Sequence, residues 1–305
     1  MGGNNMRKLI ILFTVLVLML AAVPAAVLGE TAVTSFYPIW IFTLNLTDGI
    51  GDLEVRNLAA PNTGCLHDYQ LQTGDMKTLA SADVFLINGA GMESYLDTVF
   101  GAFTDLPVVS ASDGIEFITE EDGLQIGEAE EEETVNSHVW LDAGNAVVMV
   151  HNLANGLKEA FPQYAEQITA NEERYTEELA ALDAELKETL AGLPKNGIIT
   201  FHEAFPYFAR AYGLEVLAVV NREPGETLTP KEMAELTETV RKLDLPPLFV
   251  EPQYENLSAE ILAEETGAGI FMLDPMVTGP ETDVPLDLYT QIMKKNRDAL
   301  LEALQ

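Results

Sequence analysis

The stretch Asn136-Ser-His-Val-Trp-Leu-Asp142 separates two very different parts of the chain. Before it lies a strongly acidic segment with few apolar residues, and after it begins the longest helical pattern. Its histidine, His138, is one of only four in 305 residues. Two others, His67 and His202, lie in comparably distinctive settings on either side. Histidines this rare in separate parts of a chain indicate one assembled site, and a divalent metal ion is the first candidate ligand.

Outward from this stretch, short apolar runs alternate with amphipathic ones. On the N-terminal side the pattern predicts strands at 31–36, 53–60, 84–88 and 108–110, and helices at 39–46, 75–80 and 94–103. On the C-terminal side it predicts strands at 198–201, 214–220, 248–251 and 269–273, and helices at 205–212, 230–243, 258–266 and 286–304. Such alternation is typical of parallel sheets flanked by helices. The sequence therefore predicts an α/β fold with two lobes.

Two helical segments join the predicted lobes. Asp142 can cap a helix over 144–160, and Pro162 then begins a second helix over 162–190. At 1.5 Å per residue the second helix would span roughly 40 Å, which is typical of a rigid strut between lobes. We expect an N-terminal lobe, a helical connection and a C-terminal lobe, with the boundaries 30–143, 144–192 and 193–305.

The acidic segment 116–137 interrupts the alternation. It contains Glu120-Glu-Asp122 and Glu130-Glu-Glu-Glu133 and has too little apolar surface to offset its ordering entropy. We interpret it as a mobile surface loop of the N-terminal lobe. It could gather metal ions weakly or serve only as a solvated linker.

The N-terminus is typical of a secretory signal. Arg7 and Lys8 precede an apolar run over 9–20, and small residues lead to a possible cleavage after Gly29. An uncleaved anchor is the alternative, because 9–28 is barely long enough to span a bilayer. In either case the protein is expected to work in the periplasm or on the extracellular face of the cytoplasmic membrane.

Charge and cysteine content narrow the function further. Sixteen Lys and Arg against 49 Asp and Glu give a net charge of −33, which disfavours nucleic acid and anionic membranes as partners. An acidic surface can equally reflect solubility or adaptation to salt. The single cysteine, Cys65, excludes an intramolecular disulfide and is more typical of a buried, inert thiol than of a ligand.

Four residues are candidate metal ligands. His202 and Asp274 directly follow predicted strands, where parallel α/β sheets bind ligands. His67 follows a strand through a glycine-containing turn, and His138 precedes a helix start. Three imidazoles and one carboxylate suit four-coordinate zinc, and manganese is an alternative because it accepts oxygen ligands. The alternative is that each histidine is an isolated polar residue near a turn and binds no metal.

Other residues are weaker candidates. His151 lies inside a predicted helix and is expected to be an ordinary helical histidine. His202-Glu203 lacks the second histidine of the helical zinc-protease motif H-E-x-x-H. Glu251, at a strand end, could orient a ligand histidine or make a purely structural contact.

Several motifs resemble one family, the extracytoplasmic solute-binding proteins that deliver zinc or manganese to ATP-driven (ABC) importers. Its histidine motifs are similar to Gly64-Cys-Leu-His-Asp-Tyr-Gln-Leu71, Ser137-His-Val-Trp-Leu-Asp142 and Thr200-Phe-His-Glu-Ala-Phe-Pro-Tyr-Phe208. Its closing segments resemble Phe249-Val-Glu-Pro-Gln253, Glu265-Thr-Gly-Ala268 and Leu273-Asp-Pro-Met276. The match covers nearly everything after the signal, in the right order.

The resemblance implies two α/β lobes, a long rigid helix and a metal ion held in the cleft between the lobes. It implies ligand roles for His67, His138 and His202, and by position for Asp274. A histidine at position 202 resembles the zinc branch (cluster A-I type) more than the manganese branch. That branch often has a histidine-rich loop before the second motif, which is glutamate-rich here.

The resulting hypothesis is a non-enzymatic, monomeric protein that captures zinc with high affinity and delivers it to the permease of an ABC importer. A manganese-specific relative is the first alternative. An exported zinc hydrolase, with Glu203 or Glu251 as its base, and a surface adhesion or structural protein with an incidental metal are the others.

Overall fold

The computed structural model describes residues 29–64, 66, 69–119, 125–126, 135–220, 228–244, 246–254 and 256–305. The predicted signal, residues 1–29, lies outside this part of the chain apart from Gly29. Residues 31–305 form one compact unit. Among the residues described, no helix is both long and apolar enough to cross a membrane.

The first sheet has four strands in the order β2-β1-β3-β4. They are β1 (Glu30–Thr34), β2 (Leu53–Asn57), β3 (Val84–Ile87) and β4 (Val108–Ser110), and they alternate with α2 (Tyr37–Leu46), α3 (Thr73–Leu79) and α4 (Leu96–Ala102). The central strand β3 is parallel to both β1 and β4. All four of its side chains are buried, as expected when helices cover both faces of a parallel sheet.

The second sheet has five strands in the order β5-β7-β6-β8-β9 and is parallel throughout. They are β5 (Gln125–Ile126), β6 (Gly197–Thr200), β7 (Glu215–Val220), β8 (Leu248–Val250) and β9 (Ile270–Met272). Its helices are α7 (Pro206–Tyr212), α8 (Pro230–Lys242), α9 (Leu257–Thr266) and α10 (Leu288–Leu304). Neighbouring residues of β6 face opposite sides: Ile198 joins the main core, and Ile199 joins a smaller cluster that includes Leu236 of α8 and Leu262 of α9.

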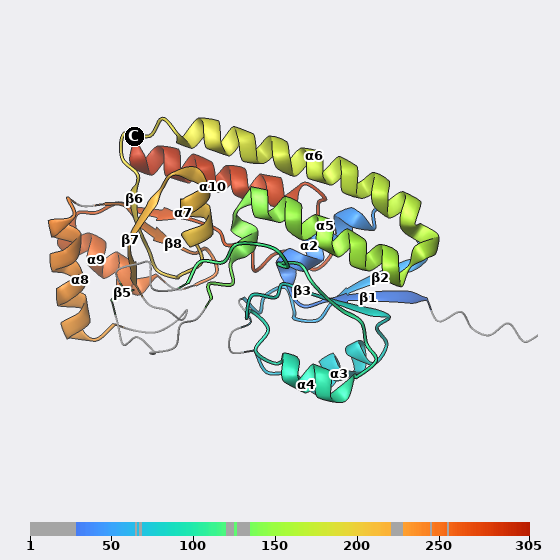
Figure 1. Cartoon of the computed structure of the whole chain (residues 1–305). Coiled ribbons are helices and arrows are strands. Elements are labelled where there is room, and N and C mark those ends of the chain that lie inside the picture. Colours follow the sequence, from blue (N-terminus) through green and yellow to red (C-terminus); the bar gives the residue numbers. More distant parts are fainter. Residues whose placement is uncertain are drawn as a thin grey trace, which may run out of the picture. The chain divides into compact units, whose positions relative to one another are not determined.

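Two long helices, α5 (Ala143–Ala160) and α6 (Ala165–Leu190), lie side by side (Figure 1). Asp142 caps α5 by accepting a hydrogen bond from Gly144 N at 2.8 Å, as predicted. α5 ends at Ala160, because Pro162 cannot donate the backbone hydrogen bond that would continue it. The helix predicted over 162–190 begins with a short 3-10 turn at Pro162–Tyr164, and α6 follows from Ala165. α6 contacts α2 of the first lobe and α7 and α10 of the second, as expected of a strut.

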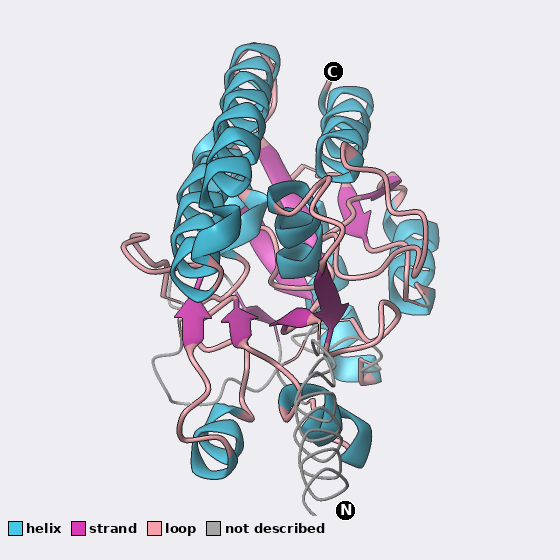
Figure 2. Cartoon of the chain, turned by 90° about the vertical axis from the view of Figure 1, so that its right-hand side faces the viewer, coloured by secondary structure: helices cyan, strands magenta, loops and turns pink. Residues whose placement is uncertain are grey.

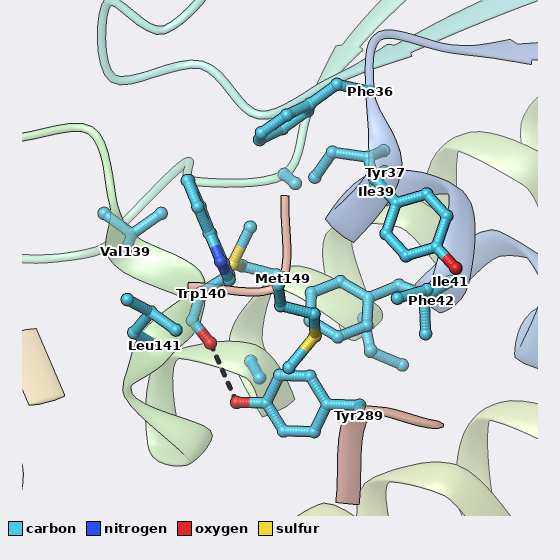
Figure 3. Packing of buried hydrophobic residues seen from close by; sticks show 14 of the residues in the cluster. Phe36, Tyr37, Ile39, Ile41, Phe42, Val139, Trp140, Leu141, Met149 and Tyr289 are labelled. Carbon is cyan, nitrogen blue, oxygen red and sulfur yellow. Dashed lines mark hydrogen bonds between the residues drawn. The ribbon is translucent and has the colours of Figure 1, made fainter. Parts of the chain in front are cut away.

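The lobes share one continuous hydrophobic core. In side view, helices flank the strands of both sheets (Figure 2). Trp140, fully buried, packs edge-on against Phe36 with ring centroids 5.2 Å apart. Its backbone oxygen accepts a hydrogen bond from the Tyr289 hydroxyl at 2.8 Å (Figure 3). Phe36 follows β1 and Tyr289 belongs to α10, so residues of both lobes meet around Trp140.

The acidic segment 116–137 departs from the loop predicted for the N-terminal lobe. Residues 120–124 and 127–134 lie outside the described part, but Gln125 and Ile126 form β5 and pair with β7 of the second sheet. Thr119 and Val135 also form an antiparallel bridge. The expectation of a segment without regular structure is therefore wrong at β5, where backbone pairing needs no apolar side chains.

Candidate metal centre

Three polar residues of the second lobe lie at the carboxyl ends of neighbouring strands. His202 comes two residues after β6, Glu251 directly after β8, and Asp274 two residues after β9. These strands are parallel and adjacent in the sheet. The strand-end placement predicted for all three is confirmed, and it brings them to one edge of the sheet.

His202 and Glu251 form a buried pair. The Nδ1 atom of His202 lies 2.6 Å from Oε1 of Glu251, and their side chains are 2% and 3% exposed. Gln253 Nε2 donates to the other carboxylate oxygen at 2.6 Å. Of the two roles left open for Glu251, the structure supports the orienting one, because an acceptor at Nδ1 fixes both the ring and its tautomer.

His138 meets His202 at this edge. The two ring centroids are 4.9 Å apart, and the ring planes are nearly perpendicular at 87°. Asn88, which follows β3 of the first sheet, donates to the Ser137 carbonyl at 3.0 Å. His138, which is fully buried, is therefore anchored to the first lobe beside a histidine of the second.

Asp274 is held in a tight turn. Its Oδ1 accepts from Met276 N at 2.7 Å, and Asn296 of α10 binds both its backbone N–H and its carbonyl at 2.8 Å. Burial raises the pKa of Asp274 above its ordinary value, the Met276 N–H opposes this rise, and the negative charge of Glu251 adds to it. Asp274 and Glu251 are thus near enough to repel each other, and a bound cation would relieve that repulsion.

Tyr37 and Trp140 connect the Asp274 turn to the first lobe and to the His138 stretch. Burial and, next, the negative charge of Asp274 raise the pKa of Tyr37 to about 12. Trp140 Nε1 donates to the Pro275 carbonyl at 2.8 Å. Two motifs that are 135 positions apart in sequence are therefore joined by one hydrogen bond.

His67 lies outside the described residues, as does Cys65. The nearby Gly64 is described and has φ +85°, and a Cβ added to it would lie 2.8 Å from the Tyr254 hydroxyl oxygen. Tyr254 is three residues after Glu251. The first lobe therefore approaches the second at Gly64, close in sequence to His67, and only glycine fits this approach without strain.

Among the described residues, no three His, Cys, Asp or Glu side chains lie together as a metal-binding group. His67 is not part of that set. The described part of the centre is an imidazole pair, with Glu251 behind one ring and Asp274 near Glu251. The ligand roles of His67, His138, His202 and Asp274 accordingly stay predictions.

His151 lies elsewhere, on α5, as expected of an ordinary helical histidine. Its side chain is 61% exposed, and its Nδ1 lies 2.7 Å from Oε1 of Glu172 on α6. The structure thus gathers His138 and His202 and leaves His151 apart from them.

Sequence reasoning missed two asparagines that support the centre. Asn136 lies beside His138 and is 2% exposed, and Asn296 holds the backbone of Asp274. A buried asparagine must find partners for its amide, but the sequence does not show which asparagines are buried. Asn136 had one available signal, its place two residues before a rare histidine.

A family model described as the periplasmic zinc-uptake complex component A, ZnuA, matches residues 32–303. The chain belongs to the ZnuA family. It is 27% identical over 285 residues to the zinc-binding protein AdcA of Streptococcus pyogenes, a match that covers 88% of this chain and 55% of AdcA. It is 28% identical over 258 residues to the iron-binding protein YfeA of Yersinia pestis, covering 83% and 80%. The chain thus spans about half the length of the AdcA relatives it matches.

Solved structures show the same fold. The chain superposes on FpvC of Pseudomonas aeruginosa in complex with Mn²⁺ with a TM-score of 0.77 and 24% identity, covering 91% of this chain and 99% of FpvC. A crystal structure of ZnuA gives a TM-score of 0.76 and 24% identity, with coverage of 91% and 100%. The predicted fold of two parallel-sheet lobes is confirmed.

The family is described as the periplasmic component of a zinc-uptake complex, and the relatives are named for the metal ions that they bind. The names of the family and of its relatives describe metal-binding components of uptake systems rather than enzymes, as predicted. The relatives differ in the metal that their names specify, including zinc, iron and manganese.

Proposed function

We propose that this chain captures zinc outside the cytoplasmic membrane and delivers it to the permease of an ABC importer. The observation that carries the proposal is the buried, nearly perpendicular imidazole pair of His138 and His202, which come from different lobes. Two rings in this arrangement can direct nitrogen atoms to one ion, and Zn²⁺ prefers imidazole nitrogen among protein ligands.

The proposed ligands are His67, His138, His202 and Asp274. A carboxylate at Nδ1 of His202 makes that nitrogen a donor, which assigns metal binding to Nε2. Asp274 would supply the one charged ligand, and its repulsion with Glu251 favours a cation there. The approach of Gly64 to Tyr254 supports His67 as the ligand from the first lobe's turn.

Manganese is the second candidate, because one neighbour of the same fold was solved in complex with Mn²⁺. Three imidazoles and one carboxylate favour zinc, whereas a site richer in oxygen would favour manganese. The two candidates differ in the order of their affinities, which a competition titration measures directly.

The test is metal analysis of the purified protein, followed by titration of the metal-free protein with zinc against manganese. We expect one zinc ion per chain and displacement of manganese by zinc. The variant His138→Ala should lose tight binding, and His151→Ala should retain it. Affinity should also fall as the pH drops through the ordinary histidine range near 6.5, because only neutral imidazole binds the ion. A stoichiometry well below one, or unchanged binding in His138→Ala, would sink the proposal.

A further inference from the structure

Asn136 contacts both histidine-bearing segments of the centre. Its Oδ1 accepts a hydrogen bond from the backbone N of His138 at 3.1 Å and lies 3.3 Å from the same residue's Nδ1. Its Nδ2 donates to the carbonyl of Glu203 at 2.8 Å. Glu203 directly follows His202, so this one amide contacts His138 and the residue next to His202.

These partners determine which way the amide of Asn136 points. The backbone N–H of His138 can only donate, so the atom that faces it must be the oxygen. The carbonyl of Glu203 can only accept, so the atom that faces it must be the nitrogen. The orientation therefore follows from the two backbone partners and not from a choice between nearly identical atoms.

The orientation of the amide also determines the tautomer of His138. Because Oδ1 of Asn136 can only accept, the Nδ1 atom of His138 carries its proton when the two bond. The lone pair of the neutral ring is then on Nε2. Glu251 imposes the same tautomer on His202, so a neutral amide and a carboxylate prepare the two rings in the same way.

Asn136 is itself held firmly in place by backbone contacts. Its N–H donates to the Ile118 carbonyl at 2.9 Å, and its own carbonyl accepts from the Tyr207 hydroxyl of α7 at 2.9 Å. The same hydroxyl accepts from the N–H of Ile118 at 2.9 Å. Elements of the second lobe thus fix the residue that orients His138, while Asn88 of the first lobe holds the adjoining Ser137 carbonyl.

We infer that Asn136 is a positioning residue for metal capture, which sets the tautomer of His138 and ties it to the strand end that carries His202. The expected effect on zinc affinity rests on the proposed function, because a His138 ring held in the Nδ1–H tautomer presents its Nε2 lone pair to the ion and binds it more tightly. Loss of such an orienting partner lowers metal affinity by about 10–100-fold in comparable sites.

The test compares Asn136→Ala with Asn155→Ala. Asn155 is a matched control because its Nδ2 lies 3.1 Å from Nε2 of His151, the exposed histidine on α5. Imidazole ¹⁵N–¹H correlation spectra of the metal-free protein report the tautomer, and competition titration reports zinc affinity. We expect Asn136→Ala to give mixed His138 tautomers and an affinity about 10–100-fold lower, and Asn155→Ala to change neither.

A single Nδ1–H tautomer of His138 in Asn136→Ala, or wild-type zinc affinity in that variant, overturns the inference. If Asn136→Ala does not fold, Asn136→Asp replaces it and keeps an acceptor oxygen of the same reach. The Nδ1–H tautomer must then persist, and its loss also overturns the inference. If the wild-type protein binds no zinc, the proposed function fails, whereas the tautomer measurement on the metal-free protein still tests the role of Asn136.

Discussion

In the part of the chain that the structure describes, two histidine–glutamate pairs have almost the same contact distance but opposite surroundings. His202 and Glu251 are 2.6 Å apart, with side chains 2% and 3% exposed. His151 and Glu172 are 2.7 Å apart, with side chains 61% and 11% exposed. Contact distance alone therefore does not distinguish a contact that supports the proposed metal site from one that joins two helices.

Their neighbours do distinguish them. Glu172 also binds Lys158 Nζ at 2.8 Å, so a lysine partly neutralises its charge. Glu251 instead lies near the carboxyl group of Asp274, and its histidine faces the ring of His138. The charge of Glu172 is thus balanced by a lysine of α5. Glu251 instead adds negative charge beside Asp274, at the buried edge where the parallel strands end. That second environment favours a cation.

The largest expected difference comes from removing each histidine. Zinc-binding free energies of about 10–16 kcal/mol over four ligands imply about 2.5–4 kcal/mol per ligand. His202→Ala should therefore weaken zinc binding by roughly two to three orders of magnitude, whereas His151→Ala should leave it unchanged. Competition titration with a chromophoric chelator measures both. Equal losses of affinity in the two variants would mean that burial and neighbouring charge do not determine which histidine binds zinc.

Removing the charge of each glutamate should give a smaller difference. Glu251→Gln loses the charged acceptor at Nδ1 of His202 and should weaken zinc binding by about 10–100-fold. Glu172→Gln should keep zinc affinity and lower the free energy of unfolding by about 1–2 kcal/mol, because two hydrogen bonds to a mostly buried carboxylate are weakened. Chemical unfolding of the metal-free variants, beside the titration, separates the two outcomes.

The sequence predicted the fold and the strand-end positions well because both depend on local patterns. Apolar runs marked the strands, and the rule for parallel sheets placed His202, Glu251 and Asp274 at one edge. The position of Asp142 at the start of α5 followed equally from its capping chemistry.

Contacts between distant polar residues could not be predicted in this way. Asn136 reaches Glu203 across 67 positions, and Trp140 reaches Pro275 across 135. β5 pairs through backbone groups within a glutamate-rich segment, where side chains give no periodic signal. Such contacts depend on how the two lobes pack together, which no single stretch of sequence records.

The third test concerns Asp274, the carboxyl group that lies near the buried His202–Glu251 pair. Asp274→Asn keeps an oxygen atom but removes the charge, and should weaken zinc binding about tenfold, or about 1.4 kcal/mol. The same change should stabilise the metal-free protein at neutral pH. A carboxyl whose pKa is raised by folding binds its proton more tightly in the folded state, so stability falls as the pH rises above the ordinary aspartate pKa.

Asp142→Asn is the matched control for this third test. Burial also raises the pKa of Asp142, and asparagine caps a helix about as well as aspartate. The control should therefore keep zinc affinity without losing stability. Weakened zinc binding in Asp142→Asn, or an unchanged affinity in Asp274→Asn, would mean that charge at the Asp274 turn does not set the affinity.

The smallest expected effect concerns the acidic segment that precedes the buried pair. Replacing 120–134 by a short glycine turn keeps Thr119, Val135 and Asn136 and removes eight acidic residues, namely Glu120, Glu121, Asp122, Glu128 and Glu130–Glu133. Because none of the proposed ligands is removed, equilibrium zinc affinity should change by no more than about twofold, an energy below 0.5 kcal/mol. If the segment is a weak antenna, its removal should slow zinc association at low ionic strength, and this difference in rate should vanish at about 1 M salt, where charges are screened within about 3 Å. Stopped-flow association at two salt concentrations tests this, and a large, salt-independent loss of affinity would show that the segment belongs to the site itself.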